Sequence, residues 1–238
     1  MIPGSFTVGV CDIGIATPQG FDAHGLARAA GGAAPERAML RPEALKGRAL
    51  VIDPASALAA SLAVRFRANV FADTPAERLG IVVASRFGSA TAVRDFADRV
   101  RRGSSAPAAF AASGYNAAAG FSAMACLAQG PSLALAGHSA SLQVAVQRAG
   151  LYLARGDADA MIAIACESLP GSTQALALGV ALRHPEAAPM ILSDSDFAAS
   201  ADPVPAGAFE AFAWLWPGID SLFGPCLTET QPERHYAR

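Results

Sequence analysis

The sequence has little charge and no excess of either sign. Charged residues make up 16% of the chain, and 18 lysines and arginines against 20 aspartates and glutamates leave a formal net charge of −2. Surfaces that bind nucleic acids carry a basic excess, so this composition gives no reason to expect a nucleic-acid partner. The arginines between residues 94 and 102 share their segment with Asp95 and Asp98, which is typical of a solvated helix face.

Cysteine is scarce and widely spaced. The four cysteines are Cys11, Cys126, Cys166 and Cys226. They form no C-x-x-C pair, and most of them fall in apolar runs, where a thiol behaves as a small buried hydrophobe. This pattern predicts a reduced, cytoplasmic protein. We expect neither a cofactor nor a bound metal.

Long uninterrupted apolar runs are also missing. Residues 1–6 lack the basic start and apolar core of a signal peptide. Further along, charge or glycine interrupts each apolar run well before the roughly 20 residues that a membrane-spanning helix needs. We therefore expect no membrane span.

Aromatic residues are few, at 7%, although 53% of the chain is hydrophobic. Alanine accounts for the difference and favours helices packed tightly against a sheet. Apolar runs predict strands at residues 6–16, 79–85, 130–136 and 160–165. Helical spacing predicts helices at 21–30, 54–68, 89–102 and 116–129, with loops at 31–46 and 107–116. Strands alternating with helices predict a layered α-β-α fold of the α/β class, with a mainly parallel mixed central sheet.

The predicted helix at 116–129 is unusual in its many small side chains. Alanine and glycine fill most of its first half, so another backbone is able to come close to it. Packing within the core explains this composition, and so does an interface with a second copy of the fold.

A sharp strand-to-helix turn is the most informative local feature. The apolar run ending at Ala136 leads into Gly137-His138-Ser139-Ala140-Ser141 and then a long helix. A serine at such a corner is placed either as a nucleophile or as the cap of the following helix. Both interpretations of Ser139 remain open from the residues alone.

The order of these features resembles the amino-terminal half of the β-ketoacyl synthases. The likeness runs through the first strand and turn at 8–20, the strand at 79–85, the Gly130-Pro131 pair before the elbow, and the Arg155-Gly156-Asp157-Ala158-Asp159 turn. It covers residues 6–168 of what we interpret as one domain over 1–238, with 195–238 as an irregular extension. The resemblance implies a thiolase-like half-fold.

Two departures from that family bear on function. The family's nucleophile is a cysteine, and Ser139 occupies its position. A serine hydroxyl without a base is not ionised near neutral pH as a cysteine at a helix start is. The family's two catalytic histidines come from a second copy of the α/β unit, for which residues 169–238 are too few. His184 and His235 stand in different contexts, interpreted as a surface turn and a terminal tail.

A ketosynthase half with its cysteine replaced is similar to the short chain-length-factor-like subunits of aryl polyene and related polyene biosynthesis. That resemblance implies a heterodimer with a cysteine-bearing ketosynthase, contact with an acyl carrier protein through the complex, and no independent activity. Ketosynthases dimerise through strands and helices of the amino-terminal half. Tyr115, Asn116 and Phe121 are therefore candidate interface residues beside the partner's chain tunnel.

Two other functions fit the same sequence. Gly137–Ser141 approaches the G-x-S-x-G elbow of serine hydrolases and acyltransferases, although Ser141 replaces its final glycine. Such an enzyme needs an acid and a base later in the chain. Candidate acids are Asp194, Asp196, Asp202 and Asp220, and candidate bases are His184 and His235. The third interpretation is a degenerate subunit that stabilises a complex without touching substrate.

The carboxy-terminal segment carries the least information. Residues 188–193 are a candidate last strand, and a polar, proline-containing loop follows. Aromatic and apolar side chains then crowd together at Phe209, Phe212, Trp214, Leu215 and Trp216. Such a cluster either seals the core or, if exposed, forms a partner site.

Overall fold

A computed structural model describes residues 7–17, 20–21, 52–104, 107–136, 141–168 and 175–193. Within these ranges the strands form one seven-stranded sheet in the order β2-β1-β6-β5-β3-β4, with β7 also paired to β1. The strands are β1 (Thr7–Thr17), β2 (Gly20–Phe21), β3 (Leu79–Ser85), β4 (Ser132–Ala136), β5 (Ala160–Ser168), β6 (Ala175–Arg183) and β7 (Met190–Ser193).

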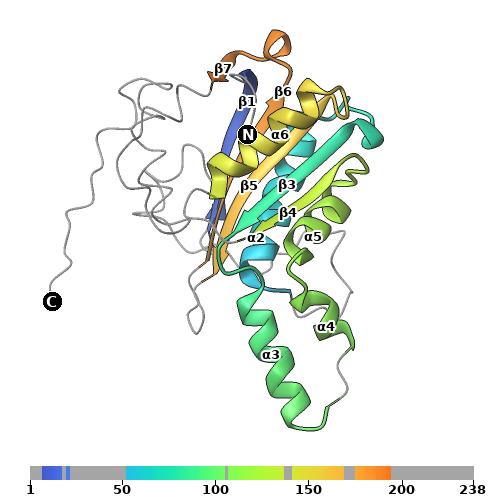
Figure 1. The fold of residues 1–238 in the computed structure, drawn as a ribbon, viewed down its shortest axis with the longest axis vertical. Coiled ribbons are helices and arrows are strands. Elements are labelled where there is room, and N and C mark those ends of the chain that lie inside the picture. The colour runs from blue at the N-terminus through green and yellow to red at the C-terminus, as the bar shows by residue number, and fades with distance from the viewer. Residues whose placement is uncertain are drawn as a thin grey trace, which may run out of the picture.

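Helices cover both faces of this sheet (Figure 1). They are α2 (Pro54–Asn69), α3 (Ala90–Arg101), α4 (Pro107–Ser113), α5 (Ala117–Cys126) and α6 (Ser141–Ala154), with 3-10 turns η3 (Ala76–Arg78) and η4 (Pro185–Ala187). Along β3, Val82 and Ala84 join the core under α6, whereas Ile81 and Val83 join the core under α2. This alternation follows from the pleat of a strand and confirms the predicted α-β-α layers.

The sheet is mixed, as predicted, but it is not mainly parallel. Among the described strands only the pairings of β3 with β4 and β5 are parallel, whereas β6 runs antiparallel to both β5 and β1, and β1 runs antiparallel to β2 and β7. The sequence interpretation omitted β6, which makes two of these four antiparallel pairings.

Several predicted elements agree closely with the structure. Strand β3 has the predicted bounds 79–85, α2 and α3 fall within one residue of their predicted ends, and the candidate last strand corresponds to β7. The predicted helix at 116–129 is shorter, because Leu127 adopts a left-handed conformation and ends it. Of the predicted helix at 21–30, residue Phe21 belongs to β2, and the rest lies outside the described residues.

The predicted loop at 107–116 was wrong, because most of it forms α4. Pro107 begins this helix, a position where the missing N–H of proline is harmless. Phe110 on α4 lies against Phe96 on α3, with ring centroids 5.6 Å apart. The two helices project together from the end of the sheet (Figure 1), so tertiary pairing makes this alanine-rich run helical.

The Gly-Asp turn that contributed to the family resemblance is held to the start of β3. The Arg78 guanidinium donates to the Gly156 carbonyl at 2.8 Å and to the Asp159 carboxylate at 2.6 Å, and the Asp159 N–H donates to the Arg78 carbonyl at 2.9 Å. The hydrogen bond from Arg78 lowers the pKa of the Asp159 carboxyl. These contacts fix where β5 enters the sheet beside β3.

Glycines under α2 allow that helix to approach the sheet closely. Gly14 on β1 and Gly179 on β6 are register partners. A Cβ at Gly179 would lie 2.8 Å from Leu62 and 2.9 Å from Phe66, and one at Gly14 would lie 2.6 Å from Leu62. The two missing side chains therefore leave the space that the Leu62 and Phe66 side chains occupy.

We predict that Gly179→Val lowers the free energy of unfolding by about 1–3 kcal/mol, because the added side chain overpacks this contact. Gly120→Ala is the matched control, since a Cβ there meets nothing within 4 Å. It should raise stability by roughly 0.5–1 kcal/mol, as expected for glycine replaced within a helix. Urea unfolding of both variants checks the prediction, and equal stability of the two would contradict it.

Candidate functional site

The strands β4, β3 and β5 end side by side, and the candidate site lies at this carboxyl-terminal edge of the sheet. Ala136, the last residue of β4, pairs with Ser85 at the end of β3. Glu167 and Ser168 end β5 on the other side of β3. In open α/β sheets this edge is the usual place for functional groups.

The predicted elbow residue Ser139 lies outside the described residues, between β4 and α6. Its flanks are described, because β4 ends at Ala136 and α6 begins at Ser141. The strand, short connection and helix that the sequence predicted are therefore present. The chain emerges from β4 beside Ser85 and the turn that follows it.

Glu167 is a buried acid at this edge that sequence analysis missed. Its side chain is 1% exposed, and its carboxylate accepts hydrogen bonds from the Arg86 N–H at 2.5 Å, the Ser85 hydroxyl at 3.1 Å and the Phe87 N–H at 3.2 Å. Burial raises the pKa of the Glu167 carboxyl, and these hydrogen bonds oppose the rise without cancelling it. A glutamate ending an otherwise apolar strand is the sequence signal for such a group.

A second buried carboxylate, Asp53, lies at the start of α2. It accepts the Ser168 hydroxyl at 2.8 Å, the Ala55 N–H at 3.0 Å and the Thr91 N–H at 3.2 Å. Asp53 thus caps α2 and also connects the end of β5 to the first turn of α3. The two acids together join the carboxyl ends of β3 and β5 to the helices beside them.

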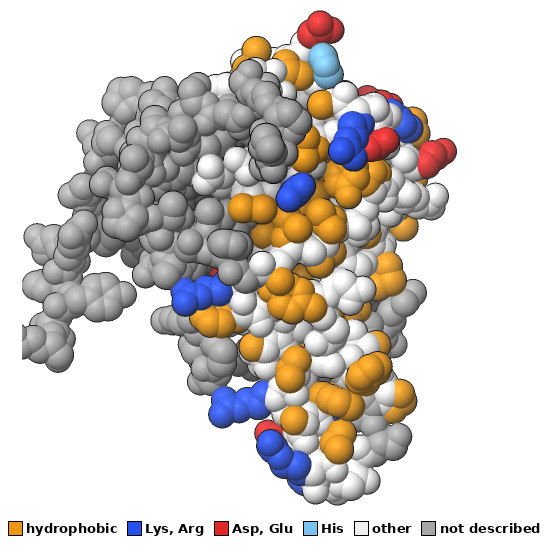
Figure 2. Space-filling view, in the orientation of Figure 1, with side chains coloured by type: hydrophobic (Ala, Val, Ile, Leu, Met, Phe, Trp, Pro, Cys, Tyr) orange, Lys and Arg blue, Asp and Glu red, His pale blue; other side chains and the backbone are white. Residues whose placement is uncertain are grey.

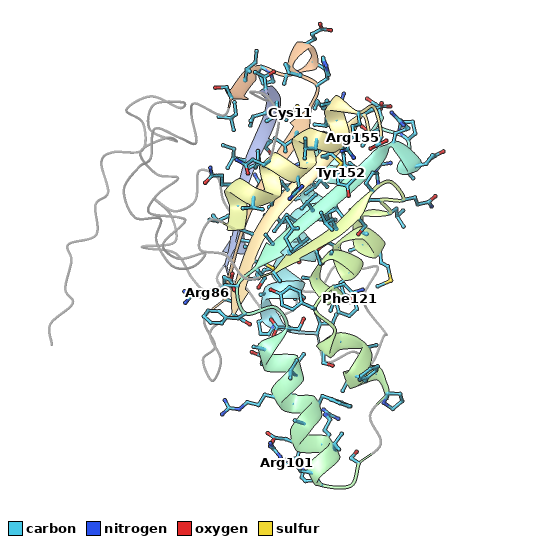
Figure 3. The ribbon with its side chains drawn as sticks, in the orientation of Figure 1. Cys11, Arg86, Arg101, Phe121, Tyr152 and Arg155 are labelled. Carbon is cyan, nitrogen blue, oxygen red and sulfur yellow. The ribbon has the colours of Figure 1, made fainter. Side chains whose placement is uncertain are left out.

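The three predicted interface residues take different positions. Tyr115 and Asn116 are exposed between α4 and α5, and the Tyr115 hydroxyl donates to the Ser85 carbonyl. Phe121 is 6% exposed and packs on Ala60, Ala92 and other small side chains. Figure 3 shows Phe121 among the helices beside the sheet. It supports α5 from within, whereas Tyr115 and Asn116 are accessible at the surface.

One side of α5 remains accessible and small or apolar. Its exposed or half-buried positions are Asn116, Gly120, Ala123, Met124 and the residue after the helix, Leu127. The opposite side packs on α2 through alanines, so core packing explains only part of the small-residue composition. Met124 is 42% and Leu127 67% exposed. We call this side the α5 stripe.

Strand β4 lies beside α5 and ends the sheet. Among the described residues it pairs with β3 alone, and its five residues are exposed or half-buried. A sheet edge with free N–H and C=O groups pairs readily with another strand. Because α5 and β4 contact each other, the α5 stripe lies near the β4 edge.

Exposed apolar side chains also occur on the projecting helices, at Val93, Val100 and Phe110 (Figure 2). Phe110 also makes the ring contact with Phe96, and Val93 and Val100 lie about one helical turn from Phe96 on α3. The arginines of this region alternate with acids as the sequence predicted, and Arg101 bonds to Asp98 at 2.7 Å. This is a solvated helix surface with mixed charge.

None of the described cysteines has the properties of a nucleophile. Cys126 and Cys166 are buried and Cys11 is half-buried, and burial raises the pKa of all three thiols. A thiol in apolar surroundings is largely un-ionised at neutral pH. Within the described ranges no three potential ligands cluster for a metal, and no helix there is long and apolar enough to cross a bilayer.

His184 lies far from Ala136, the last described residue before the elbow. It precedes η4 and follows β6, whose last residue Arg183 pairs with Ala160 at the start of β5. Ala136 pairs with Ser85, whereas His184 lies at the opposite end of β3, near Leu79. Six residues of strand separate Ser85 from Leu79, which corresponds to about 20 Å. His235 and the candidate acids from Asp194 onward lie outside the described residues.

The fold is that of a thiolase-like α/β protein. Residues 57–215 match the family model described as β-ketoacyl synthase, N-terminal domain, and this chain belongs to that family. The match includes the segment that carries Ser139. No curated protein matched the sequence.

Solved structures with this fold are similar at low sequence identity. The ishigamide ketosynthase/chain length factor is 19% identical with a TM-score of 0.58, over 77% of this chain and 63% of that one. The ketosynthase ApeO in complex with its chain length factor ApeC from Xenorhabdus doucetiae is 19% identical with a TM-score of 0.55, over 75% and 79%. A type II polyketide synthase acyl-carrier protein in complex with its ketosynthase, AntDE:AntF, is 14% identical with a TM-score of 0.54, over 77% and 64%.

We predict that Glu167→Gln changes the pH dependence of stability. A raised pKa means that the folded chain binds this proton more tightly than the unfolded chain. The resulting stability is present below the usual value of 4.5 and is lost as the pH rises through the folded-state pKa. The free energy of unfolding of the wild type, measured relative to the variant in urea, should fall as the pH rises above about 4.5. A difference that grows with pH would contradict the assignment.

Proposed function

We propose that this chain is a chain-length-factor-like subunit without condensing activity of its own. It pairs with a cysteine-bearing β-ketoacyl synthase in acyl-carrier-protein-dependent elongation of a polyene or fatty-acid-like chain. The observation that carries the proposal is Ser139 at the nucleophile position of a ketosynthase-family domain. The buried, poorly ionised cysteines add support, since none of those described substitutes for the missing thiolate.

The surface available for the partner is the β4 edge with the α5 stripe. The edge offers backbone hydrogen bonds, and the small side chains of α5 permit close approach of another helix. Tyr115 and Asn116 lie at the start of the same helix, where they would border the partner's chain tunnel. Phe121 then acts from below, as the support of that helix. The similar structures that contain a ketosynthase with its chain length factor are consistent with such a pair.

The scaffold interpretation and the serine-hydrolase interpretation make opposite predictions for Ser139→Ala. We expect the wild type and the variant to co-elute equally with the cysteine-bearing ketosynthase encoded nearby, and to support the same malonyl condensation rate. A serine that only caps a helix leaves the partner's chemistry unchanged. Co-expression, size-exclusion chromatography and a condensation assay check this. Absence of a complex, together with an esterase or acyl-transfer activity that Ser139→Ala abolishes, would instead identify a nucleophile.

Leu127 gives a test of the proposed surface. This exposed leucine has φ = +57°, a left-handed conformation that glycine and asparagine adopt more easily. Leu127→Asn should therefore keep or raise the stability of the isolated chain by up to about 1 kcal/mol. It should also weaken ketosynthase binding by about tenfold, because it removes an apolar contact.

The matched control is Ile191→Asn, at an exposed isoleucine on β7. That strand pairs with β1, away from β4 in the sheet order. Its substitution should leave the affinity unchanged. Thermal unfolding and calorimetric titration measure both quantities. Equal affinity losses for the two variants would show that the α5 stripe is not the interface.

A further inference from the structure

The turn between β3 and α3 is organised by hydrogen bonds that converge on one side chain. Glu167 accepts the N–H groups of two consecutive turn residues, Arg86 and Phe87, and the hydroxyl of Ser85. The same Ser85 hydroxyl oxygen accepts the Gly88 N–H at 2.8 Å. The conformation of residues 85–88 is therefore tied to the end of β5. Figure 3 shows Arg86 at this end of the sheet.

The carboxylate of Glu167 is poorly replaceable in this role. The Arg86 N–H, the Phe87 N–H and the Ser85 hydroxyl all donate to it, so an acceptor with two oxygens satisfies them and an amide does not. An amide would leave one of these donors without an acceptor. Burial disfavours the charged form of this carboxyl and raises its pKa. A buried acid of this kind, held by several hydrogen bonds, is a candidate for a positioning role.

The turn at 85–88 also positions Tyr115. The Ser85 carbonyl accepts the Tyr115 hydroxyl. Gly88 has φ = +56°, and a Cβ on it would lie 2.7 Å from the Tyr115 ring. The Ser89 hydroxyl donates to the Gly114 carbonyl at 3.1 Å, which attaches the backbone just before Tyr115 to the same turn. Both the ring and the backbone of the α4–α5 junction therefore follow residues 85–89.

We propose that Glu167 is a positioning residue for partner recognition, which orients Tyr115 at the head of the α5 stripe through the turn at 85–88. The inference rests on the proposed function for the identity of the partner, the cysteine-bearing ketosynthase. Tyr115 is 42% exposed, so its orientation sets the shape of the surface that the partner meets. Glu167 itself is buried and acts only through the turn.

The test follows the Tyr115 ring directly in the isolated chain. The chain has three tyrosines, Tyr115, Tyr152 and Tyr236, so fluorotyrosine labelling gives three ¹⁹F resonances, and Tyr115→Phe assigns one of them. Glu167→Gln should shift or broaden the Tyr115 resonance and leave that of Tyr152 in place. The matched control is Glu186→Gln, the same chemical change at an exposed residue of η4, which should move neither.

The second measurement is affinity for the ketosynthase, with unlabelled protein. We expect Glu167→Gln to weaken binding by about tenfold. We expect the loss to be less than additive with that of Tyr115→Phe, because both changes act through one contact. Ser85→Ala removes the hydroxyl that bonds to both Glu167 and Gly88, and it should reproduce the resonance shift. It provides the readout if Glu167→Gln does not fold.

The outcomes separate the two proposals. An unchanged Tyr115 resonance in a folded Glu167→Gln or Ser85→Ala variant overturns the positioning role. A shifted resonance with unchanged affinity also overturns it, since the orientation would then not serve recognition. If the wild type binds no ketosynthase while the resonance shifts as expected, the proposed function fails and the part of the inference that concerns partner recognition falls with it.

Discussion

Strand β3 sets the arrangement of the rest of the molecule, because it lies between the two strands that run in its own direction and is buried at every residue. A strand buried on both faces needs a helix layer on each side; α6 supplies one layer, and α5, which packs beside α2, supplies the other. Because β4 and β5 run parallel to β3, the carboxyl ends of these three strands lie together at the carboxyl-terminal edge of the sheet. The end of β4, Glu167 and the turn that holds Tyr115 therefore meet there, although they are far apart in the chain.

The elements that were predictable are those whose local pattern is strong. Strand β3 is a continuous apolar run, and α3 has regular apolar spacing, so both were found close to their true bounds. Helix α4 and strand β6 were missed for different reasons. The alanine-rich run of α4 has no marked apolar periodicity, and it pairs with α3. Strand β6 does alternate, with Leu178, Val180 and Leu182 on one face and alanines on the other, but the sequence interpretation did not use that alternation.

The site was predictable only in part. The family resemblance located the elbow and named Tyr115 and Asn116, which are exposed, but it also named Phe121, which is buried in the core. Small side chains around an aromatic ring fit both a core and an interface, so the sequence does not separate the two. Glu167 and Asp53 form hydrogen bonds to residues 38 to 115 positions away. Such long-range partners leave no spacing pattern in the sequence.

Among the described residues no strand pairs with the outer side of β4, and this has a consequence for how the protein exists in a cell. Free strand edges and exposed apolar helix sides promote self-association when nothing covers them. Mixed charge on α3 does not protect this side, because it lies on the projecting helices. Under the proposed function the partner covers this edge, and chain made in excess of that partner would aggregate or be degraded. The abundance of this protein would then depend on that of the proposed partner.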